Sequence, residues 1–367
     1  MDKNLLKKLL IIVGGFLGVL ILFLIVASVI KGVTNKKNSY ERIKINASNA
    51  AEKYYDSLKE KLNSGESIEV TFDELVSKKY MKEYTSKLDD GVKCSGKVVI
   101  SNNFDNMLYT SIMDCGKAYK DETLSEHIIN NNEIVTSGDG IYDLYGRYIY
   151  RGEKVNNYIE FDGKIWYIVD IEKNGKIRLL SSESSSETEI PWDDRYNISE
   201  EYDAGYNDYP KSRIRENLEE LAINNSVVSL NSKRYVSPQD ICVGKRNINE
   251  TDNSNAVDCS ETVKSQMLGT LTPSDVITAS IDPYCNSIGQ NQCVNYNYFY
   301  EREFSDFWML VSNSENNHSA FYCSNAIVDI SETSEYMSLY TTIKLTPEAQ
   351  YLSGDGTESN PYRIVEN

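Results

Sequence analysis

Seven cysteines are the side chains whose spacing most directly predicts chemistry in this chain. None belongs to a Cys-x-x-Cys pair, and neither histidine has a cysteine at zinc-finger spacing, so we predict no zinc site. Six of the seven lie close enough in sequence for three local disulfides, and proximity alone pairs Cys94 with Cys115, Cys242 with Cys259, and Cys285 with Cys293, while the sequence leaves the connectivity open. Closing loops of this size stabilises a domain by roughly 2–3 kcal/mol on the chain-entropy estimate. Seven reduced and buried thiols are the alternative.

Catalytic side chains are scarce. The two histidines, His127 and His318, leave little room for histidine-centred catalysis, and the chain has no Gly-x-Ser-x-Gly elbow and no phosphate-binding glycine loop. The acidic clusters at 139–143, 193–194 and 252–258 lack the alternating pattern of a calcium loop. We therefore predict neither a metal nor a cofactor. An enzyme that uses the leftover Cys323 as a nucleophile or copper ligand is kept as an alternative.

Aromatic residues favour binding over catalysis. Trp192 and Tyr196 stand in the segment Trp192-Asp-Asp-Arg-Tyr-Asn197, and together with Trp308 and Tyr322 they predict the aromatic lining of a ligand groove. Aromatic faces stack on ligands, which is the reason for this expectation. Tryptophans buried in the core are the alternative. The net charge of −17 repels phosphate backbones and argues against a nucleic-acid partner.

One segment predicts how the protein is attached to a membrane. Leu9 to Ile30 is a run of twenty-two residues without a charge. As a helix it would be roughly 33 Å long, enough to cross a hydrocarbon core of about 30 Å. A cleaved signal peptide is the alternative, but its apolar region would be about 7–15 residues and would end in a small-x-small site. Gly14 and Gly18 are spaced to let two such helices approach closely, which allows a homo-oligomer.

The cysteines indicate on which side of the membrane the chain after the apolar run lies. Three lysines precede the apolar run and three follow it, so the positive-inside rule gives no answer. Disulfides persist outside the cytoplasm. We therefore expect a single-pass protein of the cell membrane, with residues 1–8 as a cytoplasmic tail, residues 9–30 as the membrane helix and the rest outside.

The extracellular part divides into a stalk, a small module and a large domain. Residues 31–65 predict a juxtamembrane helical stalk, because apolar residues from Ile43 to Leu62 recur at three- and four-residue steps. That stripe would pack either on the next domain or on a second copy. Residues 66–119 predict a small disulfide-stabilised α/β module with a capping box at Thr71 and Glu74 and a hairpin of two strands. Residues 120–140 predict a linker.

Residues 141–367 predict an α+β domain with a largely antiparallel sheet. Its clearest element is a three-stranded meander from Tyr158 to Leu180, because Asp162-Gly163 and Asn174-Gly175 are preferred hairpin turns. Helices are expected at Lys211–Ala222 and after the Thr272-Pro273 start signal. Further strands are expected around Phe307–Val311, Ala320–Ile330, Met337–Leu345 and Tyr362–Val365.

Several of these motifs carry a resemblance. They are Tyr148-Ile-Tyr-Arg-Gly-Glu, Asn156-Asn-Tyr-Ile, Ile165-Trp-Tyr-Ile-Val, Trp192-Asp-Asp-Arg-Tyr-Asn, Asp240-Ile-Cys-Val-Gly-Lys-Arg, Leu271-Thr-Pro-Ser-Asp, Phe307-Trp-Met-Leu and Gly354-Asp-Gly-Thr-Glu-Ser-Asn-Pro-Tyr. With them the chain resembles uncharacterised membrane-anchored envelope proteins of low-GC Gram-positive bacteria. The resemblance implies a C-terminal domain of the C-type-lectin-like fold group, which also contains the formylglycine-generating enzymes. It implies no active-site residue, because the Glu-Pro-Asn and Trp-Asn-Asp signatures of calcium-dependent sugar binding are absent.

These observations predict a cell-surface protein that presents an extracellular recognition domain to a glycan, a cell-wall component or a protein ligand. An envelope enzyme of the formylglycine-generating-like fold and a structural subunit of an envelope assembly are the two alternatives, and recognition is favoured over catalysis.

Overall fold

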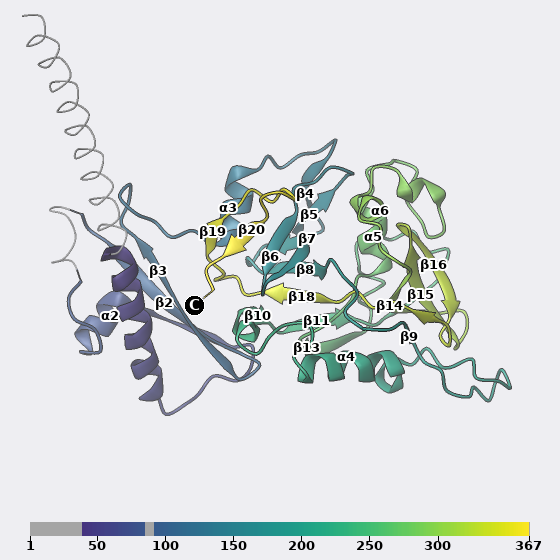
Figure 1. Ribbon diagram of the computed structural model, residues 1–367, viewed down its shortest axis with the longest axis horizontal. Coiled ribbons are helices and arrows are strands. Elements are labelled where there is room, and N and C mark those ends of the chain that lie inside the picture. The colour runs from purple at the N-terminus through teal and green to yellow at the C-terminus, as the bar shows by residue number, and fades with distance from the viewer. Residues whose placement is uncertain (1–38, 85–91, 367) are drawn as a thin grey trace, which may run out of the picture. The chain divides into compact units, whose positions relative to one another are not determined.

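A computed structural model describes residues 39–84 and 92–366 (Figure 1). The chain divides into two compact units. Of the described residues, the small unit takes in 39–61, 69–84, 92–100 and 109–120, and the large unit takes in 62–68, 101–108 and 121–366. The predicted tail, membrane helix and Gly14/Gly18 contact lie outside the described residues and stay predictions. Between residues 39 and 366, leaving out 85–91, no helix combines the length and apolar character needed to cross a bilayer.

The small unit contains a helix packed on a three-stranded sheet. The chain is helical over residues 39–56, and the sheet has the order β1 (Ser67–Thr71), β2 (Ser95–Asn103), β3 (Asn106–Asp114). Ser48 Oγ donates to the Tyr109 carbonyl at 2.9 Å, and Ser111 Oγ donates to the Lys44 carbonyl at 2.8 Å. Buried alanines on this helix allow the close approach (Ala47, Ala50 and Ala51). Of the two packing partners expected for the stalk helix, the structure shows the first, because the helix packs on its own chain. The helix ends at residue 56 rather than 62.

The capping box predicted at the start of the short helix α2 (Phe72–Ser77) is formed only in part. Thr71 caps the helix by accepting a hydrogen bond from the Glu74 amide. Glu74 does not return the bond, because its carboxylate pairs with Lys78 at 2.7 Å. The Cys94–Cys115 disulfide joins the ends of β2 and β3, as the sequence predicts for a module with a thin core.

The large unit is built on two sheets. The strands of the first are β4 (Gly140–Leu144), β5 (Arg147–Arg151), β6 (Tyr158–Phe161), β7 (Lys164–Glu172), β8 (Ile177–Ser181), β10 (Val236–Ser237), β18 (Thr342–Leu345), β19 (Tyr351–Ser353) and β20 (Tyr362–Ile364). Their order is β10-β18-β8-β7-β6-β20-β19, with the β4–β5 hairpin joined to β7 through β5. The second sheet has the order β12 (Lys245–Arg246), β14 (Phe307–Asn313), β15 (Ser319–Ser324), β16 (Ile327–Glu332).

Two ribbons complete the strands of the large unit, one of β11 (Gln239–Cys242) with β13 (Thr262–Gln266) and one of β9 (Ile190–Pro191) with β17 (Tyr336–Met337). Among the paired strands of the large unit within residues 121–366, only β12–β14 and β20–β6 are parallel. The chain is therefore a mixed α and β protein, mostly strands, with mainly antiparallel sheets, as the sequence predicts.

The predicted meander is formed by β6, β7 and β8. Asp162 and Gly163 both have positive φ in the first turn, at 55° and 69°, which is the geometry that Asp-Gly favours. In the second turn only Gly175 has positive φ, so that connection is not the two-residue turn that we expected.

Helices cover and join the sheets. They are α3 (Leu124–Asn131), α4 (Arg213–Ile223), α5 (Pro273–Ala279) and α6 (Tyr298–Glu301), with single 3₁₀ turns at Tyr209–Lys211, Ser232–Tyr235 and Asn291–Val294. Helix α5 starts at the predicted Thr272 cap and contacts β5 of one sheet and β15 and β16 of the other (Figure 1). The expected linker 120–140 is instead part of this unit, because Leu124 and Ile128 of α3 are fully buried in its hydrophobic core.

Candidate functional site

The two tryptophans of the predicted aromatic groove are core residues. Trp192 and Trp308 are both fully buried. Their Nε1 atoms donate to the Met309 carbonyl at 2.9 Å and to the Ile190 carbonyl at 3.1 Å, so even the polar edge of each ring is satisfied inside the protein. Tyr322 is half-buried with its ring edge-on to Trp308. These residues cannot line an open groove, and that expectation is corrected for the two tryptophans. Of the four residues predicted to line the groove, only Tyr196 is exposed.

The cysteines form the three predicted disulfides, Cys94–Cys115, Cys242–Cys259 and Cys285–Cys293. Cys323 is free and buried, and burial raises the pKa of its thiol to about 12. A buried neutral thiol is a poor nucleophile, so the structure gives the Cys323 enzyme hypothesis no support. Among the described residues, no group of three or more histidine, cysteine or acidic side chains is arranged to hold a metal ion.

Tyr196 belongs to the connection between β9 and α4, and we call residues 193–206 the display loop. A buried aspartate fixes its two ends. Asp193 is fully buried, and its carboxylate accepts hydrogen bonds from Arg195 Nε at 2.8 Å and from the Tyr206 amide at 2.7 Å. The Asp193 amide donates to the Thr333 carbonyl, which ties the loop to the end of β16. The first and last residues of the loop are thus held together from within.

A buried asparagine shapes the tip of the display loop. Asn197 is fully buried, and its amide Nδ2 donates to the Gly205 carbonyl at 2.6 Å while its Oδ1 accepts from the Ser199 amide at 3.0 Å. Its backbone amide donates to the Tyr202 carbonyl at 2.9 Å and closes a small hairpin. Just beyond the loop, buried Asn207 Nδ2 lies 2.9 Å from each of three backbone carbonyls, those of Asn313, Asn316 and Ser319.

Gly205 is required where the loop returns to its base. Its φ is +72°, and a Cβ atom there would lie 1.9 Å from the Asp193 carbonyl oxygen. No larger residue fits at this point without moving the backbone, because both the torsion angle and the space are restricted.

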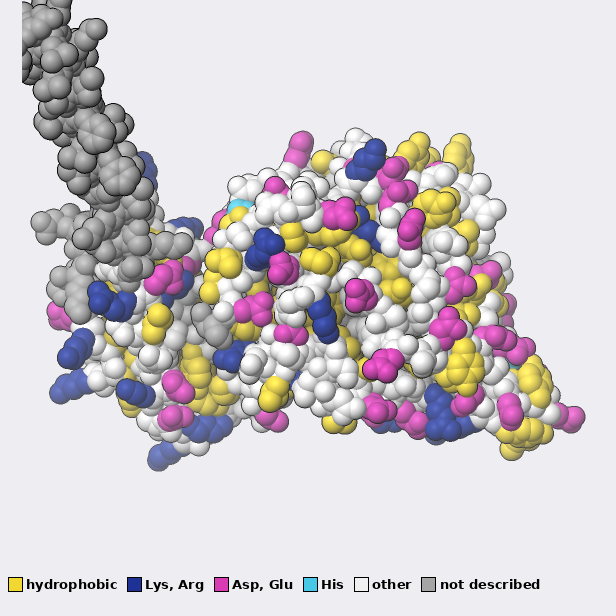
Figure 2. All heavy atoms as spheres, in the orientation of Figure 1, with side chains coloured by type: hydrophobic (Ala, Val, Ile, Leu, Met, Phe, Trp, Pro, Cys, Tyr) yellow, Lys and Arg dark blue, Asp and Glu magenta, His cyan; other side chains and the backbone are white. Residues whose placement is uncertain are grey.

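The ordered backbone presents apolar side chains to solvent. Tyr196 is 56% exposed, Ile198 78% and Tyr202 44%, while Asn197 between the first two points inward. Figure 2 shows hydrophobic and acidic side chains together at the lower right, where the loop extends in Figure 1. Acidic residues lie next to these side chains in the sequence, namely Asp194, Glu200, Glu201 and Asp203, and Asp194 pairs with Arg213 Nε at 3.1 Å. His318 Nδ1 lies 3.1 Å from Glu200 Oε1 and gives the tip a further contact with the second sheet.

A second polar region lies between the first sheet and helix α5. Arg178 Nη2 lies 2.6 Å from Asp275 Oδ1, and its Nε donates to Asp170 Oδ2 at 2.8 Å. Arg147 Nη1 bonds the same Asp170 oxygen at 3.0 Å. A cavity of about 280 Å³ opens beside this network. The two arginines and two aspartates neutralise one another, so the network offers a ligand no net charge.

The sequence identified Tyr196 through its aromatic neighbours but missed Ile198 and Tyr202. The available sequence signal was alternation: the polar Asn197 stands between the large apolar side chains of Tyr196 and Ile198, in a segment rich in Asp and Asn, residues that hydrogen-bond to the backbone in turns. No protein-family model, curated protein or solved structure matches this chain.

Proposed function

We propose that the large unit is the ligand-recognition domain of a single-pass cell-surface protein, and that the display loop binds a protein ligand. The observation that carries the proposal is the contrast within this loop. Its backbone is fixed by buried polar side chains, Asp193 and Asn197, while its large apolar side chains face solvent.

Preorganisation is the first reason. Ordering a loop on binding normally costs free energy, and that cost is reduced when the free protein already holds the bound conformation. The display loop has the required internal bonds, including the pairing of Asn197 with Tyr202. Rigid tyrosines add contact area with little loss of side-chain entropy.

The exposed side chains are the second reason. Burying a side chain of the size of Ile198 contributes roughly 1.5–3 kcal/mol, and two tyrosines flank it. Interface hot spots are typically a few such residues within a rim of polar groups. The rim here is acidic, so the ligand that fits best offers an apolar pocket bordered by lysine or arginine.

The disulfides and the topology support the remaining parts of the proposal. Three disulfides fit an extracellular domain behind a membrane helix at residues 9–30, because disulfides persist outside the cytoplasm. A C-type-lectin-like layout is part of the proposal on the resemblance of the motifs alone; the last strand, β20, returns to pair in parallel with β6 near the start of the domain.

The test is a selection of phage-displayed peptides on the full-length protein in lipid nanodiscs. We expect the selected peptides to combine apolar residues with lysine or arginine and to bind more weakly as ionic strength rises. Ile198→Asp should lower their affinity by at least about tenfold, which corresponds to 1.4 kcal/mol. The matched control is Leu352→Asp on β19, since Leu352 is also an exposed aliphatic residue, at 55%.

Two outcomes would contradict the proposal: peptides that bind the Ile198 variant as tightly as the parent protein, or equal losses in the Leu352 control. Asn197→Ala adds a separate check. This variant keeps all three exposed side chains but removes the Asn197 side-chain hydrogen bonds to Gly205 and Ser199. It should therefore weaken binding only because the backbone of the display loop is no longer held in place.

Glycan recognition is a second candidate, favoured by a different loop. Residues 283–300 contain no charged residue, in a chain of which 25% is charged. The segment is bridged by Cys285–Cys293 and exposes Tyr284, Tyr296 and Tyr300. Aromatic rings and amides suit a neutral sugar. Binding of neutral oligosaccharides on an array that is lost when these tyrosines become alanine, and kept in Tyr336→Ala, would establish this function.

A further inference from the structure

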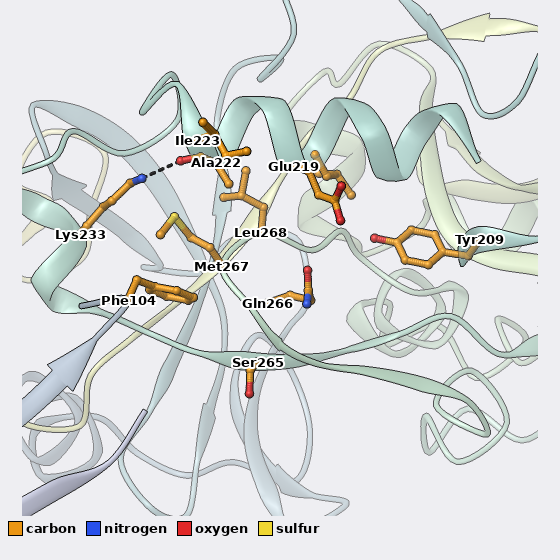
Figure 3. A pocket seen from close by; sticks show the side chains of 11 residues that line it. Phe104, Tyr209, Glu219, Ala222, Ile223, Lys233, Ser265, Gln266, Met267 and Leu268 are labelled. Carbon is orange, nitrogen blue, oxygen red and sulfur yellow. Dashed lines mark hydrogen bonds between the residues drawn. The ribbon is translucent and has the colours of Figure 1, made fainter. Parts of the chain in front are cut away.

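An apolar cavity of about 340 Å³ lies between α4 and the strand β13, and its size falls within the about 300–1,000 Å³ of small-molecule sites. Figure 3 shows its lining. Ala222 and Ile223 of α4 form one side, and Met267 and Leu268, which follow β13, lie opposite them; Leu218 of α4 also lines the cavity. Leu218, Met267 and Leu268 are buried. This part of the cavity can accept only an apolar group.

One end of the cavity holds a lysine without a counter-ion. Lys233 is only 9% exposed and lines the cavity, and its Nζ donates to the Ala222 carbonyl at 2.6 Å. Within the described part of the chain this carbonyl is the partner of the ammonium group, and no carboxylate pairs with it. Buried charges in proteins are normally paired. Burial lowers the pKa of Lys233, an electrostatic cost that a bound anion would offset.

The other charged residue of the cavity does not supply the missing anion. Glu219 points into the cavity beside Tyr209, at the opposite end from Lys233 (Figure 3). Its carboxylate is already paired with Arg215 Nη2 at 2.7 Å. The cavity therefore has a cationic end, an apolar middle and a polar end formed by Glu219 and the Tyr209 hydroxyl.

We propose that this cavity binds an apolar ligand with a single carboxylate head, with the carboxylate on Lys233 and the chain over Met267 and Leu268. A carboxylate accepts charge-assisted hydrogen bonds from the lysine, which are stronger than the bond to the neutral Ala222 carbonyl. The apolar chain replaces water over the buried floor. A free short-chain fatty acid and the C-terminus of a peptide ending in an apolar residue share this chemistry.

The experiment follows the methyl resonance of Met267 by ¹³C-methyl-methionine NMR of the full-length protein in lipid nanodiscs. Hexanoate is the probe, and N-acetyl-leucine represents a peptide C-terminus. We expect both to shift the Met267 signal in a saturable way, and the tighter one identifies the source of the ligand. Hexylammonium has the same chain with the opposite charge and should bind at least about tenfold more weakly, since it loses the ion pair.

Two lysine variants test the position of the head group. Lys233→Gln should weaken hexanoate by about tenfold or more while leaving the other methionine signals in place. Lys164→Gln is the matched control, because Lys164 Nζ also bonds backbone carbonyls, those of Ser226 and Val227, but belongs to a different cavity. No Met267 shift up to the solubility of hexanoate, or hexylammonium binding as tightly as hexanoate, would overturn the inference. The display-loop variant Ile198→Asp should bind hexanoate normally, so failure here is separable from failure of the proposed function.

Discussion

Replacing Asp275 by Asn should destabilise the large unit more than any exposed charge substitution. Both carboxylate oxygens of Asp275 accept from Arg178, at 2.8 Å from Nη1 and 2.6 Å from Nη2, and the Thr272 amide donates to the same side chain at 2.9 Å. The Asp275 side chain is 1% exposed and that of Arg178 is 9% exposed. The substitution removes one charge of a buried network and leaves two arginines facing only Asp170.

The expected loss is about 3–5 kcal/mol in the free energy of unfolding, the usual cost of removing one partner of a buried ion pair. For a domain of this size each kcal/mol shifts Tm by about 2–4 °C, so Tm should fall by about 6–20 °C. Asp143→Asn is the control. Its pair with Lys173 is 2.7 Å long but exposed, and such pairs contribute about 0–1 kcal/mol.

The same residue predicts a dependence on pH. Burial alone raises the pKa of Asp275, but the charges of Arg178 and then Arg147 outweigh burial and hold that pKa well below its usual range. A depressed carboxyl pKa stabilises the fold above the unfolded-state value of about 3.9, and this stability is lost as the pH falls through the folded-state pKa. The difference in the free energy of unfolding between the parent protein and Asp275→Asn should therefore be constant from neutral pH to about pH 4 and should shrink below pH 4.

The assay is urea unfolding of the full-length protein with its disulfides intact, followed by circular dichroism across this pH range. A loss below about 1 kcal/mol at neutral pH would refute the reasoning, because it would mean that the buried network contributes no more than an exposed pair. A free-energy difference that keeps its full size well below pH 4 would show that the charge of Asp275 is not the source of the stability, because the contribution of a depressed carboxyl pKa falls once the pH drops below the unfolded-state value.

Two further predictions concern the display loop and the free thiol. Gly205→Ala should cost more than about 1 kcal/mol and make the loop sensitive to protease, because of both its positive φ and the close Asp193 carbonyl; Gly289→Ala, at φ +73° with open space, controls for φ alone. Cys323 should resist thiol reagents at neutral pH in the folded protein and react fully on unfolding, as counted by mass spectrometry. Fast labelling of the native protein would restore Cys323 as a candidate nucleophile.

The helix start, the hairpin turn and the local disulfides could be predicted from the sequence alone. Thr272 and Pro273 start α5 because the threonine hydroxyl caps a free amide and proline fits the first helical position. Asp162 and Gly163 close the β6–β7 hairpin because both residues tolerate positive φ. The three disulfides were predictable because their partners are only 8 to 21 residues apart, so local loops bring them together.

Tertiary structure alone decided which side chains are available to a ligand. Trp192 and Tyr196 are four residues apart and equally aromatic in the sequence, yet one is fully buried and the other exposed. That difference depends on β14, whose Met309 carbonyl accepts the Trp192 indole NH from more than a hundred positions away. Lys233 looks like an ordinary surface lysine in the sequence, but α4 and the segment after β13 line the cavity around it. Burial and charge pairing arise from contacts between segments that are distant in the sequence, so no local sequence pattern predicts them.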